Sequence, residues 1–216
     1  MILNSSHFQS GSLHINNAQG AVSTFGAVDN GIQSFIDECE ELVLSDALNP
    51  TLYATIKTHY TDNALNSGAP QWLKDLVNGL VYTYEDKTYS FKGLGNGSSC
   101  LAYFIFNNYL IQNYGTLGID GMQHDVNSAS TPIDPTPKDV ETWNAFVTKY
   151  QGDSYLNNLP LIHHNSYGTM IDYYGKDKQS SIVNLLTFLE HYEKLNPNTY
   201  ENLNKRLYER KNSFGL

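Results

Sequence analysis

The chain has 216 residues, which suits one domain of ordinary size and is long enough to bury a core without disulfide or metal staples. Its formal net charge of −9 and isoelectric point of about 5.1 argue against a nucleic-acid binder that neutralises phosphates, and against an anionic membrane surface as partner. No segment approaches the roughly 20 apolar residues of a membrane span, and residues 1–6 lack the features of a signal peptide, so we expect a soluble protein made in a cytoplasm.

The first half of the chain predicts an arm followed by three helices. Residues 1–29 are polar with scattered apolar residues, and we expect an extended arm that is ordered mainly by what it touches. A helix is then predicted, because apolar residues recur at helical spacing and carboxylates fall on the other face. Its apolar stripe consists of Ile32, Phe35, Ile36, Cys39, Leu42 and Val43. Asn49 and Pro50 predict the start of a second helix, and Pro70 opens a third.

A short aromatic hairpin follows at residues 81–91. Tyrosine and phenylalanine alternate with valine, threonine and serine on both sides of a Glu85-Asp86-Lys87 turn, and a period of two is typical of strands. A glycine-rich turn at 93–97 then leads into a helix over about 99–113, whose opening residues are apolar almost all round. Such a helix is expected to be the central and most buried one.

The second half predicts helices separated by long connections. Residues 114–136 are irregular, and a loop of this length in a compact domain is usually functional or part of an interface. A helix with Trp143 in its apolar stripe follows, and residues 151–178 are again irregular. Two helices are expected to close the chain, one through Leu185 and Tyr192 and one that begins after Asn196-Pro197 and carries Tyr200, Leu203 and Leu207.

These elements predict a mainly α fold, a helical bundle of about six helices with one small β-hairpin and long loops and arms. No βαβ alternation and no internal repeat is present in the sequence. We divide the chain into an extended arm at 1–29, a helical core at 30–150 with the hairpin at 81–91, and a C-terminal loop and two-helix extension at 151–216.

The sequence contains no strong candidate for a set of catalytic or metal-binding residues that would come together in one site. His163-His164 lacks two further ligands at the spacing that a structural metal site needs, and the carboxylates from Asp37 to Glu41 lie along one helix rather than across a cleft. Cys100, like Cys39, lies in an apolar pattern, so we expect buried free thiols. The glycine-rich turn superficially suits phosphate but has no lysine after it. We predict no catalytic residue, no metal site and no cofactor.

One loose carboxylate–imidazole cluster lies in the 114–136 connection. It consists of His124 with Asp120 and Asp125, which are residue types that bind metals or transfer protons. The cluster supports an alternative interpretation from a different functional class. In that alternative, the chain is a small α-helical enzyme or binding module that uses this loop.

The order of elements resembles that of a known family. The residues that carry the resemblance are Phe35-Ile36, Leu52-Tyr53, Trp72 to Gly79, the aromatic hairpin, Phe91-Lys92-Gly93-Leu94, Leu101 to Leu110, Gly115 to Gly118, Asn127-Ser128 and Trp143. Over roughly residues 30–150, this pattern of aromatic and glycine positions resembles the head-to-tail connector (adaptor, or head-completion) proteins of tailed bacteriophages. It is closest to the branch found in phages of Bacteroidetes-like hosts.

The resemblance implies a structural virion protein of the neck or tail region. Its helical-bundle subunits would assemble as a homo-oligomeric ring, a dodecamer that matches the portal, and continue the DNA channel. The implied partners are the portal protein and other neck or tail ring proteins, and DNA would pass through without sequence-specific binding. An acidic protein fits such a conduit because like charges repel. A tail terminator or a second ring is the alternative within this class.

Charge and aromatic patterning suggest which surfaces such a ring would use. No lysine or arginine precedes Lys57, whereas basic residues cluster near the end of the sequence. This asymmetry predicts either two solvated helix faces or an acidic and a basic end that meet, in neighbouring copies or in a partner. Ring contacts are heterologous, so one surface must complement a different one. The candidate interface residues are Glu38 and Glu41 on the acidic first helix, Tyr84 and Tyr89 on the hairpin, and Arg206 and Arg210 on the basic C-terminal helix.

Overall fold

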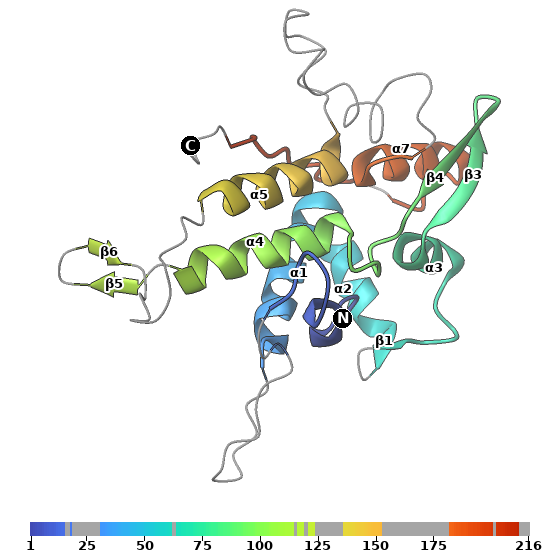
Figure 1. Ribbon diagram of the computed structural model, residues 1–216. Coiled ribbons are helices and arrows are strands. Elements are labelled where there is room, and N and C mark those ends of the chain that lie inside the picture. Colours follow the sequence, from blue (N-terminus) through green and yellow to red (C-terminus); the bar gives the residue numbers. More distant parts are fainter. Residues whose placement is uncertain are drawn as a thin grey trace, which may run out of the picture.

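The computed structural model describes residues 1–15, 18, 31–61, 64–114, 116–118, 121–123, 136–152, 182–200 and 202–211. These residues form six α-helices and three two-stranded antiparallel sheets (Figure 1). The mainly α class predicted from the sequence is therefore confirmed. The two small sheets beyond the aromatic hairpin were not predicted, and they pair β1 (Tyr60–Thr61) with β2 (Ala64–Leu65) and β5 (Thr116–Gly118) with β6 (Gly121–Gln123).

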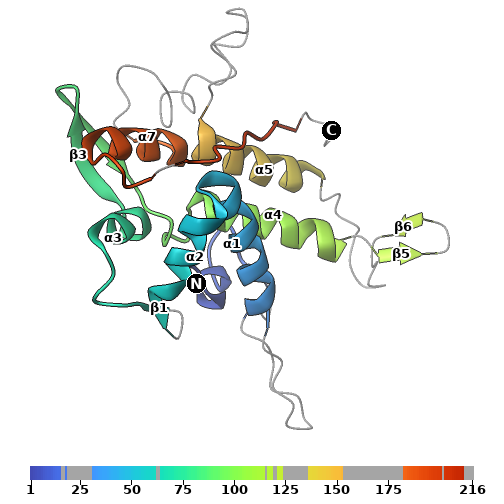
Figure 2. The ribbon, with the colours of Figure 1, turned by 180° about the vertical axis from the view of Figure 1, so that it is seen from behind.

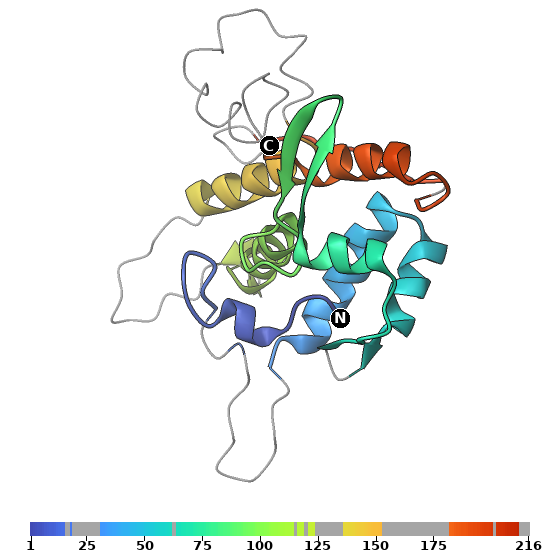
Figure 3. The ribbon, with the colours of Figure 1, turned by 90° about the vertical axis from the view of Figure 1, so that its right-hand side faces the viewer.

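The helices are stacked around α4 (Cys100–Tyr114). On one side α4 packs against α5 (Thr136–Gln151), and on the other side against α1 (Gln33–Ala47), which pairs with α2 (Pro50–Thr58). Figures 2 and 3 show α5 and α7 (Leu185–Leu195) above α4, with the first residues and the start of α1 below it. Leu101, Ala102, Phe104, Ile105 and Phe106 are all buried. The predicted central position of this helix is confirmed.

Local sequence signals set several boundaries correctly. Pro50 occupies the first turn of α2, and the Asn49 side chain accepts a 2.8 Å hydrogen bond from the N–H of Leu52, as an N-cap does. α3 (Gln71–Asn78) follows Pro70 and ends at Gly79. Capping interactions of this kind join residues that are close in the sequence, so they can be predicted without the tertiary structure.

Two glycines allow two backbone segments to lie very close together at the base of the hairpin. Gly79 ends α3 and Gly93 follows the hairpin, and their φ angles are 89° and 81°. A Cβ atom on Gly79 would lie 2.5 Å from the carbonyl oxygen of Phe91, and a Cβ on Gly93 would approach the Val77 carbonyl just as closely. Only glycine fits positions that combine a left-handed backbone with such a close approach.

The predicted hairpin consists of β3 (Leu80–Tyr84) and β4 (Lys87–Phe91), with Tyr82 opposite Tyr89. Its two-residue turn places Glu85 and Asp86 at φ 47° and 61°, which matches the right-handed twist of the strands. On the other edge of β4, the N–H of Val183 donates to the Ser90 carbonyl at 3.1 Å. The hairpin projects past the end of α7 (Figure 1).

The first residues correct the prediction of an extended arm. They contain a short 3-10 helix, η1 (Ser5–Phe8), and bury five apolar side chains, Ile2, Leu3, Phe8, Leu13 and Ile15. The N–H groups of Ile2 and Leu3 donate to the buried carboxylate of Glu40 on α1. These partners are distant in sequence, which explains why the polar composition of the segment was misleading. Residues 19–30 of the predicted arm lie outside the described residues.

The last predicted helix is also wrong, because residues 203–211 form neither a helix nor a strand. The N–H groups of Asn204, Lys205 and Arg206 donate to the carbonyls of Leu48, Ala47 and Asp46 at 3.0, 3.3 and 3.1 Å. The carbonyls at a helix C-terminus have no partner within the helix. At the end of α1 this segment satisfies them, and the N–H groups that do so are not available for bonds within a helix of their own. We call the segment Leu203–Lys211 the strap.

Candidate functional site

The strap lies along α5 and is held there mainly through its backbone. Gln151 donates from Nε2 to the Tyr208 carbonyl at 2.9 Å and accepts the Tyr208 N–H at 2.8 Å. Two turns earlier, Asn144 makes the same pair of bonds with the carbonyl and N–H of Lys211, at 2.9 and 3.0 Å. The indole N–H of Trp143 donates to the Glu209 carbonyl at 2.7 Å. Side-chain amides thus bind the strap much as a neighbouring strand would.

Tyr208 anchors the strap among four aromatic rings. Its ring centroid lies 4.9 Å from Phe146, 5.2 Å from Tyr150, 5.8 Å from Trp143 and 6.4 Å from Phe104. The hydroxyl donates to Asp46 at 2.6 Å, and burial raises the pKa of the phenol well above its usual value. An aromatic group seated in this way contributes both apolar burial and a defined register.

Ion pairs within the chain neutralise most of the basic residues of the strap. Lys211 Nζ lies 2.6 Å from Asp139 on α5, Arg206 pairs with Asp46 at 3.2 Å, and Lys205 pairs with Glu190 at 3.0 Å. Arg210, the other predicted basic interface residue, donates to the Thr148 hydroxyl. Of these three carboxylates only Asp46 belongs to the acidic stretch before Lys57, and its pair with Arg206 lies within one copy. A meeting of the two ends between copies or with a partner stays a prediction.

A buried asparagine places Asp139 for its contact with the strap. Asn107 on α4 donates from Nδ2 to the Asp139 carboxylate at 2.7 Å and to the Thr142 hydroxyl at 3.0 Å. Both acceptors belong to α5, so this side chain joins the two central helices. Asp139 then receives Lys211, whose ammonium also lies 5.3 Å from the Trp143 ring centroid. Helix packing and strap binding thus share one polar network.

The two predicted acidic interface residues lie on the outer face of α1. Glu38 and Glu41 are exposed, and Leu42 beside them is 52% exposed. Glu41 forms an exposed ion pair with Lys57 on α2 at 2.8 Å. A pair of this kind contributes little to stability. This face is therefore accessible, and its role as an interface stays a prediction.

The predicted hairpin tyrosines face α7 instead of a partner. The Tyr84 ring stacks on His191 with a centroid distance of 4.2 Å, and the Tyr89 ring lies 5.0 Å from the same imidazole. The Tyr82 hydroxyl is 3.0 Å from His191 Nδ1. Because strand side chains alternate, the opposite face presents Val81, which is 68% exposed, to solvent. The sequence showed the alternation but not which face α7 would cover.

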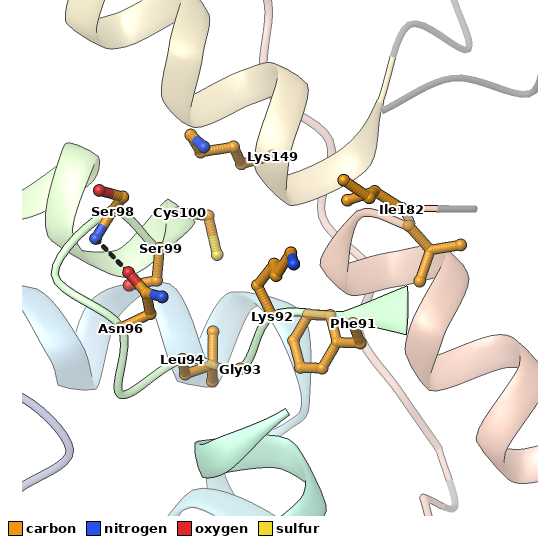
Figure 4. A pocket seen from close by; sticks show the side chains of 11 residues that line it. Phe91, Lys92, Gly93, Leu94, Asn96, Ser98, Ser99, Cys100, Lys149 and Ile182 are labelled. Atoms are coloured by element: carbon orange, nitrogen blue, oxygen red, sulfur yellow. Dashed lines mark hydrogen bonds between the residues drawn. The ribbon is translucent and has the colours of Figure 1, made fainter. Parts of the chain in front are cut away.

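A cavity of about 300 Å³ lies between the glycine-rich turn and α5 (Figure 4). Lys92 lines it just after the end of β4, Lys149 lines it from α5, and Ser98 lines it from the turn. None of its described lining residues is acidic, so its chemistry suits an anion better than a cation. The sequence did not indicate that Lys149 lies beside the glycine-rich turn, since Lys149 belongs to α5 and the turn precedes α4.

The two cysteines are free and buried, as expected. Burial raises the pKa of both thiols to about 12, which makes Cys39 and Cys100 poor nucleophiles at neutral pH. In the part of the chain that the structure describes, no group of three potential metal ligands occurs, and no helix has the length and apolar character to cross a membrane. His124 with Asp120 and Asp125, and the pair His163-His164, lie outside the described residues.

Comparisons with protein-family models, curated proteins and solved structures found no match for this chain. The resemblance to phage connectors therefore rests on the sequence pattern alone and stays a prediction.

Proposed function

We propose that this protein is a structural virion protein of a tailed phage, a ring-forming connector or adaptor that lies between portal and tail and continues the DNA channel. The observation that carries the proposal is the order of elements on which the resemblance rests. Helices α1, α2 and α3, a projecting aromatic hairpin, and helices α4 and α5 follow one another between Gln33 and Gln151. Gly79 and Gly93, which allow the close backbone approach at the base of the hairpin, belong to the same pattern.

Two different accessible surfaces support assembly into a ring. One is the acidic face of α1 with Glu38, Glu41 and the exposed Leu42, and the other is the outer face of the hairpin with Val81. They lie on separate elements and differ in chemistry. A head-to-tail contact needs two unlike surfaces, whereas a symmetric dimer uses the same surface twice.

The charge distribution supports a conduit through which DNA passes freely. The formal net charge is −9. Lys205, Arg206 and Lys211 already pair with carboxylates of the same chain. These three residues are thus neutralised and do not form a basic patch that would grip phosphates.

The proposal is tested by quantitative mass spectrometry of purified phage particles from the source of this sequence. We expect the protein in the particle at a copy number close to that of the portal protein and far below that of the capsid protein. A tail terminator or second ring would also be found in the particle, and electron microscopy of labelled particles would then place it at the tail rather than at the portal. Absence from the particle would overturn the proposal.

A further inference from the structure

We propose that the strap exchanges between copies, so that α5 and the end of α1 in one copy bind residues Leu203–Lys211 of the next. This inference rests on the self-assembly contained in the proposed function, and it adds a contact between copies to the two accessible surfaces named there. The binding surface is the one occupied within the chain by the strap, and its occupant would be the identical segment of a second copy.

The surface that holds the strap binds its backbone. Asn144 and Gln151 each bind a strap residue through both its N–H and its carbonyl. The carbonyls at the end of α1 likewise accept N–H groups of the strap. A strap from a second copy offers the same groups in the same order, so all of these bonds can be made between copies.

The anchor residue Tyr208 fixes the register of the strap. Tyr208 is enclosed by rings from α4 and α5 and bonded to Asp46 of α1. Lys211 then meets Asp139 three residues later. An incoming strap would therefore be recognised at two positions, through the aromatic ring of Tyr208 and through the charge of Lys211. This recognition favours the same sequence over an unrelated extended peptide.

The connection that precedes the strap is short. Tyr200 is buried and its hydroxyl donates to the Trp72 carbonyl at 3.2 Å, so the chain is fixed in its own copy up to this residue. Only two residues separate Tyr200 from Leu203, and one of them, Asn202, adopts a φ of 57°, which asparagine tolerates better than most residues do. Short hinges favour exchange.

The geometry of an exchanged strap also suits a ring. The segment that leaves one copy and the surface that receives it are different parts of the molecule, so the contact is heterologous. Such a contact can be repeated from copy to copy until the ring closes. Every hydrogen bond and ion pair that a strap breaks in its own copy can form again with the next copy. Exchange therefore changes the partner of each interaction and leaves the set of interactions the same.

The test uses the unmodified protein and its own ion pairs. Equal amounts of ¹⁴N- and ¹⁵N-labelled chains are unfolded together, refolded at high concentration, and treated with a zero-length carbodiimide cross-linker. Oligomer and monomer fractions are then digested and analysed by mass spectrometry. Lys211–Asp139, at 2.6 Å, reports on the strap, whereas Lys57–Glu41, at 2.8 Å between α1 and α2, is the control within one copy.

We expect about half of the Lys211–Asp139 cross-links in the oligomer to join a light and a heavy peptide, and the Lys57–Glu41 cross-links to join peptides of one label. An oligomer in which both cross-links carry one label would overturn strap exchange and leave the proposed ring intact. A chain that stays monomeric at every concentration would overturn strap exchange and also contradict self-assembly of the free protein, while the particle measurement would still decide whether it is a virion component.

A pair of variants checks the anchor. Tyr208→Ala is expected to remove most mixed-label cross-links, whereas Leu207→Ala changes an exposed neighbour in the same strap and is expected to leave them unchanged. An unchanged Lys57–Glu41 cross-link shows that each variant is folded. Equal loss in both variants, or none in either, would contradict the role assigned to Tyr208.

Discussion

At the scale of single residues, Phe104 is the clearest test of the core. Its side chain is 3% exposed, and its ring lies 4.9 Å from Phe146 and 6.3 Å from Trp143. We expect Phe104→Ala to lower the free energy of unfolding by about 3–5 kcal/mol, because it removes apolar contacts and leaves a cavity. Urea denaturation measures this change, and Val81→Ala on the exposed hairpin face is the control. A loss below about 1 kcal/mol would mean that α4 is not central.

Glu40 is the residue that ties the first segment to the helices. It is 1% exposed, and its two carboxylate oxygens accept the N–H groups of Ile2 and Leu3 at 3.0 and 2.6 Å. Burial raises the pKa of the carboxyl to about 7, while these two hydrogen bonds act in the opposite direction. Nearby charges are the Met1 amino group, which lowers this pKa, and Asp37, which raises it.

This shift predicts a pH dependence with a definite sign. The pKa of Glu40 in the folded protein lies above the ordinary value of 4.5, so the folded state binds more protons than the unfolded state between about pH 4.5 and pH 7. Through that window the free energy of unfolding of the wild type should fall, relative to Glu40→Gln, as the pH rises. Urea denaturation at a series of pH values measures it.

The control for this experiment is Glu38→Gln, which changes an exposed carboxylate on the same helix. Its pH profile should run parallel to that of the wild type. If Glu40→Gln also runs parallel, Glu40 does not titrate in this window.

At the scale of elements, the hairpin and α7 meet at a single histidine. His191 contacts Tyr82, Tyr84 and Tyr89, and its pKa is lowered by burial and by the neighbouring Lys194. Glu190 and Glu85 oppose this effect more weakly. The neutral imidazole therefore favours the packed hairpin, and a proton on it disfavours that packing.

Acidification should consequently loosen the hairpin. The stability that neutral His191 contributes is complete above its unfolded pKa of about 6.5 and is lost as the pH falls below that value. We expect hydrogen exchange of β3 and β4 amides, corrected for intrinsic rates, to accelerate between pH 7.5 and pH 5. In His191→Phe, which keeps an aromatic ring but cannot titrate, this acceleration should be absent.

His59→Gln, at the end of α2, is the matched histidine control and should behave as the wild type does. The same acceleration in His191→Phe as in the wild type would show that another group governs the hairpin. The effect has the opposite sign to that of Glu40, so the two titrations are distinguishable within one protein.

The strap shows how one element decides the conformation of another. Tyr200, Leu203 and Leu207 have a spacing that is compatible with a helix, and the preceding Asn196-Pro197 is a typical helix start. The unsatisfied carbonyls at the end of α1 and the amide side chains of α5 offered the backbone better partners than a helix would. Helical periodicity is a weak signal when such tertiary partners exist.

At the scale of the whole molecule, one hydrophobic cluster contains side chains from Ile2 to Tyr200. The first fifteen residues and α7 contribute to it together with the central helices. Assembly through the exposed surfaces of α1 and the hairpin would leave this core unchanged, since those surfaces are separate from it. The strap is the part of the molecule where folding within one copy and binding between copies would use the same contacts.

The sequence by itself determined the class of the fold, the hairpin and most helices between residues 31 and 151. Those features follow from periods of 3.6 and 2 and from caps and glycines, all of which act between near neighbours. The tertiary structure alone decided the non-helical strap, the burial of the first segment and the face of the hairpin that meets α7. Tyr82 and His191 are 109 residues apart, and Tyr208 and Asp46 are 162 apart. Partners so distant leave no periodic signal in either segment, so only the folded chain shows which of them meet.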